Sequence, residues 1–490
     1  MKKILYGIVF VLPFILGAIG FYLGGEIARD SLYYSLSLYF MSLNSDSVNP
    51  LIEIARWMAP VMTASGLILA IKSAVSRLRD KVSCMHGDAT AVYSDGGNAN
   101  GELLMNTLKH GIASDKAVVK GARSHILMFE NDVDNLNFYQ TNQAFFENQK
   151  VYMKLEKMDS YLLKESKVHF FNSNEIIARQ YWKERHLLSY LDAEPASQQE
   201  TDAVGEQLQV DVAIVGFGPL GQRMLQYGLL NNIYSNKQRI TYHVFGDSRL
   251  YQQVYPSFPM MNQDSIVFHV QDWREDFSIF SKMERVILTE EPDLELVQDL
   301  LYTCNNTRID YFSKGNIVLE DVYKTDLLYG YGKAADIYTE ENIKTDRLYQ
   351  AAMELNYKYA CLYGGVCGSA EEIAAMDKKV AMEREWNALD GFTKGSNITS
   401  ADYHEIRKQV IAYSMQVGKE LTPDELAEGE HIRWSRFHFL NHWSYGVPEN
   451  GKNKDGKKKI HVCLVPYEEL PEKEKKKDFE AVELLLELFQ

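Results

Sequence analysis

Three glycines and one aspartate form the pattern in this sequence that points most directly to chemistry. Gly216, Gly218 and Gly221 follow an apolar run rich in Val and Ile, in the spacing Gly-x-Gly-x-x-Gly. In this context the first glycine makes a tight turn, the second lets backbone N–H groups approach a pyrophosphate, and the third packs a helix on a strand. The phosphates are expected at the positive end of the helix dipole. Asp247 ends a second apolar run, where a carboxylate binds ribose hydroxyls.

The elements that must hold these residues are strands alternating with helices. Short apolar runs predict four strands, and a helical pattern follows the motif and also the last of these runs. Such an alternation indicates a parallel, doubly wound sheet. Two interpretations stay open, namely a nucleotide-binding domain and a scaffold of the same fold that has lost its ligand. The predicted strands are 210–215, 240–245, 265–270 and 285–289.

Composition limits the classes that remain. The chain has 490 residues, enough for about three to four domains. Its formal charge of −15 argues against nucleic acid as a partner. Its five cysteines lack Cys-x-x-Cys spacing, so the sequence predicts neither a zinc site nor a disulfide framework, as is typical of a reducing cytosol.

The N-terminal part differs from the rest, because it carries two long apolar stretches. Residues 4–23 are uncharged and long enough to cross a bilayer, and residues 57–71 predict a second span if flanking basic side chains reach the interfaces. A signal peptide is the alternative for the first stretch. Lysines precede the first span and basic residues follow the second, which places both flanks in the cytoplasm of a bacterial inner membrane.

Between the two spans lies an uncharged segment, residues 31–45, with apolar residues near helical spacing and serines opposite them. A half-length apolar helix between two spans predicts a re-entrant pore helix. Asn44, Ser45, Asp46 and Ser47 would then occupy the position of an ion filter. A loop lying flat on the membrane surface is the alternative.

The order of span, pore helix, filter and span resembles two-helix potassium-channel subunits with nucleotide-binding cytosolic domains. One hairpin cannot enclose a pore, so any channel must be oligomeric, and the resemblance implies a homotetramer. Potassium filters present carbonyl oxygens through glycine-dependent backbone, and the segment from Asn44 to Val48 has no glycine. Potassium selectivity is therefore not expected, whereas a ring of Asp46 carboxylates would favour cations.

A less regular copy of the strand–turn–helix pattern lies earlier in the chain than the motif at residues 216–221. The run 89–95 leads into Gly96-Gly97-Asn98-Ala99-Asn100-Gly101, in which Asn98 replaces the middle glycine. A side chain there should crowd a pyrophosphate, so nucleotide binding is expected to be altered or absent. Both copies resemble the Rossmann lobes of regulator-of-potassium-conductance domains, also called Trk-type NAD-binding domains.

The C-terminal part carries an unusual set of aromatic residues and histidines. The pattern is formed by His431, Trp434, Trp443, Tyr445, Gly446, His461, Leu464, Pro466 and Leu470. This pattern closely resembles the ryanodine-receptor (RyR) repeat domain, and structural or ligand-contacting roles are expected for these side chains. The spacing of the histidines fits no metal finger. The candidate ligand contacts are His431, Trp434, Trp443, Tyr445, His461, Pro466 and Tyr467.

These observations predict an α/β protein with two Rossmann-like sheets, an N-terminal transmembrane helical hairpin and a mainly α-helical C-terminal RyR-type domain. The polar stretch 191–209 is expected to be a linker. The predicted division is 1–80 for the hairpin, 81–190 and 210–330 for the two Rossmann-like domains, 331–415 for a helical connector and 416–490 for the RyR domain.

The leading hypothesis is a tetrameric ion channel or pore-forming effector that opens when a regulatory ligand, NAD or another nucleotide, binds its cytosolic domains. Analogy with the family extends this to stress or antiviral signalling. A membrane-anchored sensor or scaffold without a pore is the second hypothesis. A third is an NAD-dependent oxidoreductase, but the sequence shows no Tyr-x-x-x-Lys pair or other donor set for hydride chemistry. We therefore expect no catalytic residues, no metal site and no enzymatic activity.

Overall fold

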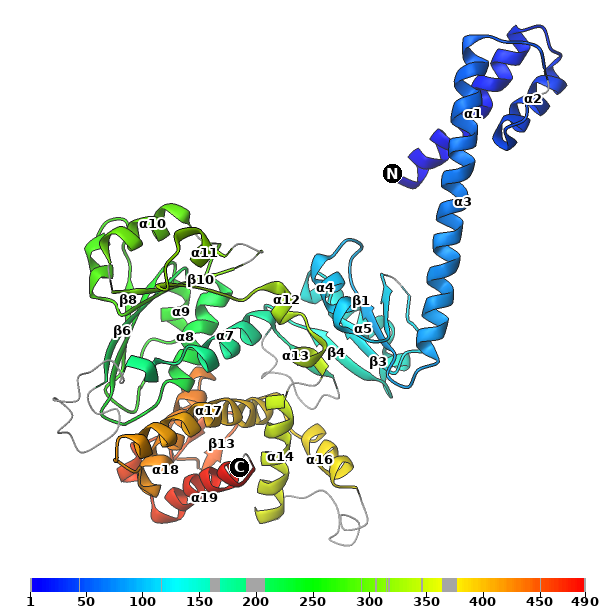
Figure 1. The fold of residues 1–490 in the computed structure, drawn as a ribbon. Coiled ribbons are helices and arrows are strands. Elements are labelled where there is room, and N and C mark those ends of the chain that lie inside the picture. The colour runs from blue at the N-terminus through cyan, green and yellow to red at the C-terminus, as the bar shows by residue number, and fades with distance from the viewer. Residues whose placement is uncertain are drawn as a thin grey trace. The chain divides into compact units, whose positions relative to one another are not determined.

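A computed structural model shows the chain in two compact units, residues 1–89 and residues 90–490, and each is described by itself (Figure 1). The structure describes residues 2–43, 45–115, 117–158, 168–190, 208–291, 293–304, 306–313, 315, 318–344, 347–363, 377–449 and 451–488.

The first unit is a helical hairpin that holds a short helix between its two long ones. Its elements are α1 (Lys2–Leu23), α2 (Ala28–Ser37), the 3-10 turn η1 (Leu38–Phe40) and α3 (Pro50–Cys84). Glycines on α1 allow close approach, because an added Cβ would lie 2.5 Å from Ser35 Oγ at Gly17 and 2.8 Å from Ile52 Cγ1 at Gly20. The lack of a side chain at these two positions therefore lets α1 approach α2 and α3 closely.

One segment of this unit is long and apolar enough to cross a membrane by length and composition, among the residues that the structure describes. It is Pro50–Ile68 in α3, and a shorter apolar helix covers Phe10–Leu23 in α1. A pair of membrane spans is therefore not confirmed. The short helix predicted between the spans is present as α2 and η1, and it packs on both long helices.

In the second unit, the first parallel sheet has the order β2-β1-β3-β4-β5 within the described residues. The strand β2 was not predicted, because its sequence Gly-Ile-Ala-Ser carries little strand signal. Order 2-1-3-4-5 is that of doubly wound nucleotide folds. The elements are β1 (Thr90–Tyr93), α4 (Ala99–Thr107), β2 (Gly111–Ser114), β3 (Ser124–Leu127), α5 (Asp132–Thr141), α6 (Gln143–Phe146), β4 (Lys150–Lys154), β5 (His169–Phe171), α7 (Ser173–Glu184) and η3 (Leu187–Tyr190).

The second parallel sheet has the order β11-β10-β9-β6-β7-β8 in the described part of the chain. Numbered from its own first strand, this is the 3-2-1-4-5-6 order of the Rossmann fold, so the predicted α/β class with two doubly wound parallel sheets is confirmed. The elements are β6 (Gln209–Val215), α8 (Pro219–Asn231), β7 (Arg239–Phe245), α9 (Arg249–Val254), β8 (Ser265–His269), η5 (Phe277–Lys282), β9 (Arg285–Leu288), α10 (Leu294–Thr303), β10 (Arg308–Phe312), α11 (Leu319–Tyr323) and β11 (Leu328–Tyr331).

Helices dominate the remainder of the second unit. The predicted linker, residues 191–209, lies outside the described residues up to residue 207. A small three-stranded sheet follows the longest helices. The elements are α12 (Ala334–Ile337), α13 (Glu340–Lys344), α14 (Arg347–Tyr363), α16 (Lys378–Asn387), α17 (Gly391–Gln416), α18 (Pro423–Leu440), β12 (Ser444–Tyr445), β13 (Lys454–Asp455), β14 (Ile460–His461), η6 (Tyr467–Glu469) and α19 (Glu472–Leu488).

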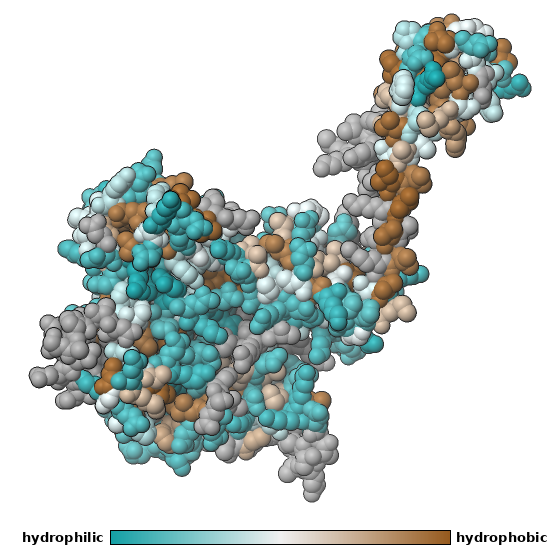
Figure 2. Space-filling model, in the orientation of Figure 1, coloured by the Kyte–Doolittle hydropathy of each residue, from teal (hydrophilic) through white to brown (hydrophobic). Residues whose placement is uncertain are grey.

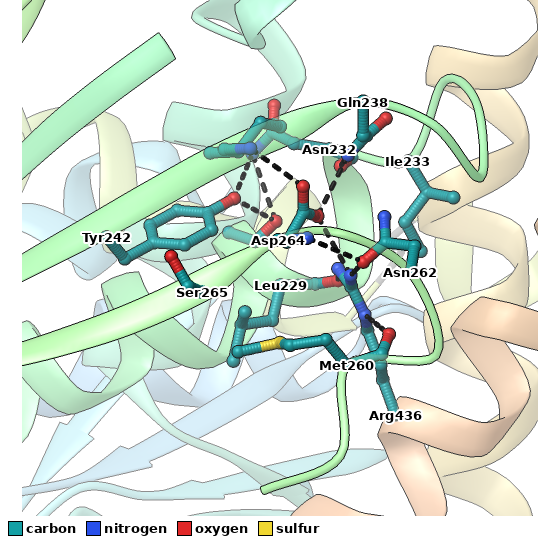
Figure 3. Close-up of polar contacts among 12 residues, drawn as sticks. Leu229, Asn232, Ile233, Gln238, Tyr242, Met260, Asn262, Asp264, Ser265 and Arg436 are labelled. Carbon is teal, nitrogen blue, oxygen red and sulfur yellow. Dashed lines mark hydrogen bonds and ion pairs between the residues drawn. The ribbon is translucent and has the colours of Figure 1, made fainter. Parts of the chain in front are cut away.

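A buried arginine on α18 ties the C-terminal helices to the second sheet (Figure 3). The Arg436 guanidinium lies 2.8 Å from an oxygen of Asp264, and both side chains are fully buried. It also donates to the carbonyl oxygens of Leu229 and Met260 and to the Asn262 side chain. Leu229 belongs to α8, and Met260, Asn262 and Asp264 belong to the loop before β8, so Arg436 joins α18 to a helix and a loop of the second Rossmann-like domain. Breaking a buried charge pair by removing one partner costs several kcal/mol, roughly 3–5.

Candidate functional site

The candidate site is a cleft of about 860 Å³ at the carboxyl ends of β6, β7, β8 and β9. The first strand of this sheet, β6, lies between β7 and β9, so the chain turns in opposite directions on its two sides. Ligands of open α/β sheets bind in the crevice at such a switch point. The cleft is lined by Gly216, Gly218 and Asp247, so the structure brings three of the four predicted nucleotide-binding residues together.

The glycine turn is fixed by its own backbone and by the neighbouring strand. Gly216 has φ +90°, a conformation that disfavours residues with a side chain. Its carbonyl oxygen accepts a hydrogen bond of 2.6 Å from Thr289 Oγ1 at the end of β9. Gly221 does not line the cleft but packs beneath it, because an added Cβ there would lie only 2.1 Å from the Gly216 oxygen.

Gly218 has the opposite environment, and this matters for ligand binding. It is the N-cap of α8, and no side chain caps the helix there. An added Cβ would meet a single atom within 4 Å, Glu290 Oε1 at 3.9 Å, so the position is open towards the cleft. Backbone N–H groups at the start of a helix attract anions when no side chain satisfies them. This turn therefore offers an anion position at the floor of the cleft.

Asp247 directly follows β7, where a ribose-binding carboxylate was expected, and it is engaged by a neighbour. Its oxygens accept hydrogen bonds of 2.9 and 2.6 Å from Arg249, and both side chains are exposed. The hydrogen bonds from Arg249 lower the pKa of Asp247 to about 2, so the carboxylate is ionised at neutral pH. The pKa of Arg249 is raised by the same contact.

Sequence reasoning missed several residues of the cleft. Glu290 follows β9, and Trp273 follows β8, with the Arg274 guanidinium 4.1 Å from the centroid of its ring. Their position directly after predicted strands could have identified them, because the residues that follow parallel strands of one sheet meet at the same edge. Among the described lining residues, five carboxylates face two arginines, and both arginines are themselves paired with carboxylates. The cleft is thus acidic except at the start of α8.

The corresponding turn of the first sheet is closed by its own side chain. Asn98 is the N-cap of α4, and its Oδ1 accepts hydrogen bonds from the backbone N–H groups of Asn100 and Gly101 at 3.0 and 3.2 Å. The groups that would bind a phosphate are thus satisfied within the chain. The expectation of altered or absent nucleotide binding at this turn stays a prediction, now with a defined physical cause.

The C-terminal candidates form an aromatic cluster around Trp434 on α18. The Trp434 ring lies 3.9 Å from the ring of His438 and 4.9 Å from that of His461, measured between centroids. His431 is buried, and its Nδ1 lies 3.2 Å from Asp478 on α19. Burial lowers the pKa of His438 to about 3 and that of His461 to about 4, so both rings are neutral at pH 7.

The members of this cluster differ in their access to solvent. His431 and Trp443 are buried, and Trp443 stacks on Phe392 with a centroid distance of 5.3 Å, so these two stabilise the core. A ligand could contact only the exposed and half-buried members of the predicted set. Tyr445 and Pro466 are exposed, whereas Trp434, His461 and Tyr467 are half-buried.

The predicted filter residues lie in the loop before α3. Asn44 lies outside the described residues. Ser45 Oγ lies 2.7 Å from Glu26 Oε1, and Ser47 Oγ lies 3.3 Å from the carbonyl oxygen of Gly24, so both serines attach the loop to the turn between α1 and α2. Asp46 is exposed. In the part of the chain that the structure describes, no group of three His, Cys, Asp or Glu side chains is placed to hold a metal ion.

Residues 409–490 match the family model of the RyR domain. This confirms the prediction of an RyR-type domain in the C-terminal part of the chain. The match covers less than half of the chain, and no curated protein matches the sequence.

Solved structures to which the chain is similar include oxidoreductases and a synthase. They include phosphoglycerate oxidoreductase from Vibrio cholerae o395, with 15% identity, coverage of 49% of this chain and 82% of that one, and a TM-score of 0.21. The A chain of dipicolinate synthase from Bacillus subtilis has 12% identity, coverage of 51% and 91%, and a TM-score of 0.23. A D-isomer specific 2-hydroxyacid dehydrogenase from Xanthobacter autotrophicus Py2, in complex with NADPH and MES, has 11% identity, coverage of 54% and 94%, and a TM-score of 0.22.

These matches correct one prediction. The prediction that excluded an enzymatic activity was wrong, because the proteins just described are named for catalytic activities. It rested on the absence of a Tyr-x-x-x-Lys pair and of a convincing His/Asp set, and the lack of recognisable motifs in the sequence does not exclude an enzymatic activity. Turnover of a bound dinucleotide is therefore a measured outcome in the experiment proposed below.

Proposed function

We propose that this protein is a membrane-anchored, homo-oligomeric nucleotide sensor that gates an ion-conducting pore. The observation that carries the proposal is the uncapped start of α8 at Gly218, open to a cleft of about 860 Å³ at the switch point of the sheet. That arrangement supports a dinucleotide such as NAD, because it combines an anion position with a carboxylate for ribose.

The parts of such a ligand have distinct places in the cleft. The pyrophosphate would lie against the backbone of Gly218. The ribose hydroxyls would donate hydrogen bonds to Asp247, which is ionised at neutral pH. The adenine would lie near Trp273, beyond β8. A carboxylate at this position supports NAD by accepting from a ribose hydroxyl, whereas Arg249 beside it offers a partner for a 2′-phosphate, so NAD⁺ and NADP⁺ are compared in the test.

Helix α18 of the C-terminal domain supports coupling between the domain that holds the cleft and the aromatic cluster around Trp434. Trp434 and Arg436 lie two residues apart on α18 and point to different partners. Trp434 contacts the histidine cluster, and Arg436 is bound by the loops of the second sheet. A ligand at either place can change the other only through different affinities for two arrangements of this joint.

In this proposal the first unit is the membrane part of the sensor. The short helix α2, which packs on α1 and continues into η1 against α3, supports a re-entrant pore helix, and Asp46 in the following loop supports a cation-attracting ring in a tetramer. Basic residues at both flanks support cytoplasmic placement of the soluble domains at a bacterial inner membrane. The apolar serine-containing helix alone is compatible with an anchor that does not conduct.

The test uses the full chain in liposomes, with NAD⁺, NADH, NADP⁺ and a cyclic dinucleotide added separately. Binding, cation flux and consumption of the ligand are measured in parallel, with Gly218→Asn as the binding-deficient control. The expected result is NAD-dependent flux that is absent in the control and altered in selectivity by Asp46→Asn. Binding without flux would favour the anchored sensor, consumption of NADH with a substrate would favour an oxidoreductase, and no binding of any nucleotide would overturn the proposal.

A further inference from the structure

The long helix α3 carries an apolar stripe that no other described element of the first unit covers. The stripe residues for which an exposure is recorded are between 48% and 85% exposed. They recur with alternating steps of three and four residues, which is the heptad pattern of a coiled-coil seam. In heptad notation the a positions are Ile54, Val61, Ile68, Val75 and Val82. The d positions are Trp57, Ala64, Ile71, Leu78 and Met85.

A second stripe on the same helix shows what a satisfied face looks like. Ile52, Ala55 and Ala59 are buried, and they pack with Phe21 of α1 and Leu38 of η1. This inner stripe serves the hairpin and ends near Gly66, where an added Cβ would meet Phe10 of α1. The outer stripe continues for almost three further heptads, and Figure 1 shows α3 extending past the end of α1.

Lipid cannot cover the whole outer stripe. Up to Ile68 the helix is apolar enough to lie in a membrane. Between residues 72 and 81 the sequence carries five charged residues, so this part of the helix does not belong in hydrocarbon. Yet Val75 and Leu78 remain 60% and 64% exposed there, and Figure 2 shows apolar side chains along this part of the helix. An apolar seam in an aqueous setting marks a contact with protein.

We propose that this seam binds the same seam of a second copy of the chain, in parallel and in register. A stripe with a period of 3.5 residues stays in contact only with a helix of the same period. Identical helices in register place Val75 against Val75 and Leu78 against Leu78, and every a position is β-branched, as parallel coiled coils favour. Parallel packing also follows if all copies enter one membrane in the same direction.

The inference concerns the joint between copies and is separate from the nucleotide cleft, so either can fail alone. Its test is disulfide cross-linking of the full chain in native membranes. In a Cys84→Ser background, Leu78→Cys places a thiol on the seam, and Asp80→Cys places one two residues away at position f, on the opposite side of the helix. The other native cysteines are common to both variants.

Mild oxidation should give about tenfold more disulfide-linked dimer with Leu78→Cys than with Asp80→Cys, because only seam positions bring two Cβ atoms within disulfide range. Equal cross-linking of the two variants, or none with either, would overturn the proposal. A second measurement does not depend on thiols. The double variant Val75→Arg, Leu78→Arg should reduce the mass of the solubilised oligomer, whereas Asp80→Arg should not, and an unchanged mass in the double variant would also overturn it.

Discussion

The two glycine turns of this molecule start from the same strand–turn–helix pattern and end in different states. At the second turn, Gly218 leaves the start of α8 uncapped and open to a cleft. At the first, Asn98 accepts two hydrogen bonds from the start of α4 and closes it. The backbone N–H groups of a helix start can serve the helix or a ligand, and one side chain decides which.

The closing glycines of the two turns differ in the same sense. An added Cβ at Gly221 would lie 2.1 Å from the carbonyl oxygen of Gly216, which is backbone and cannot rotate away. At Gly101 the nearest atom would be Ser94 Oγ at 2.8 Å, which belongs to a small side chain with other rotamers. The turn at residues 216–221 therefore has less space for an added side chain than the turn at residues 96–101.

The largest effect is expected from placing alanine at these two glycines. Gly221→Ala should lower the free energy of unfolding by roughly 2–3 kcal/mol, because the helix must move off the turn. Gly101→Ala should cost less than about 1 kcal/mol, because Ser94 can rotate. Thermal unfolding of the solubilised protein measures both. Equal shifts in the two variants would remove the claimed difference in tolerance.

The second variant converts the open turn into the closed one. Gly218→Asn should leave the fold intact, since the position faces open space, and the new side chain should cap α8. Dinucleotide affinity should fall by about 10- to 100-fold, as expected when hydrogen bonds to a charged group are lost. Calorimetric titration measures the affinity, and thermal unfolding provides the control. Unchanged affinity would show that the phosphates do not use this helix start.

Local signals in the sequence were sufficient to predict much of this comparison. The glycine spacing, the strand runs and Asp247 are determined by residues close in the chain, and the structure places them as that pattern requires. Asn98 could be recognised from the sequence as a replacement of the middle glycine of the motif. Its role as a cap could not, because capping depends on backbone angles that the sequence does not state.

Contacts between distant residues were beyond prediction. Arg436 and Asp264 are 172 residues apart and were not paired in advance, since many carboxylates in an acidic chain are equivalent by sequence. Strand β2 was missed because Gly111 and Ser114 weaken its pattern, and its neighbour β1 supplies the pairing that stabilises it. Glu290 was missed because its proximity to the glycine turn comes from a strand encoded some 70 residues later.

A smaller effect is expected at the first turn. Asn98→Ala removes the cap of α4 and should lower the free energy of unfolding by about 1 kcal/mol. It should create no dinucleotide site, because removing the Asn98 side chain frees two backbone N–H groups but adds neither a cleft nor a carboxylate for the ribose. Thermal unfolding and titration of the same preparation measure both parts. New high-affinity binding would mean that Asn98 alone suppresses a complete site.

The smallest effect concerns the charge that faces the open turn. Glu290 lies beside Gly216 and Gly218, so its carboxylate opposes a pyrophosphate at the start of α8. At a separation of several Å in a solvated cleft, one such repulsion costs about 0.5–1 kcal/mol. Glu290→Gln should therefore tighten dinucleotide binding about two- to fivefold at low salt. The gain should shrink in high salt, because exposed charges are screened.

The matched control for this experiment is Glu295→Gln on α10, a change of the same type at a residue in the first turn of the following helix and outside the cleft lining. It should leave the affinity unchanged. If Glu290→Gln weakened binding instead, the carboxylate would be an acceptor for the ligand, as for a hydroxyl or amide group. The acidic cleft would then select its ligand by hydrogen bonding at Glu290, and the pyrophosphate would have to lie away from Gly218.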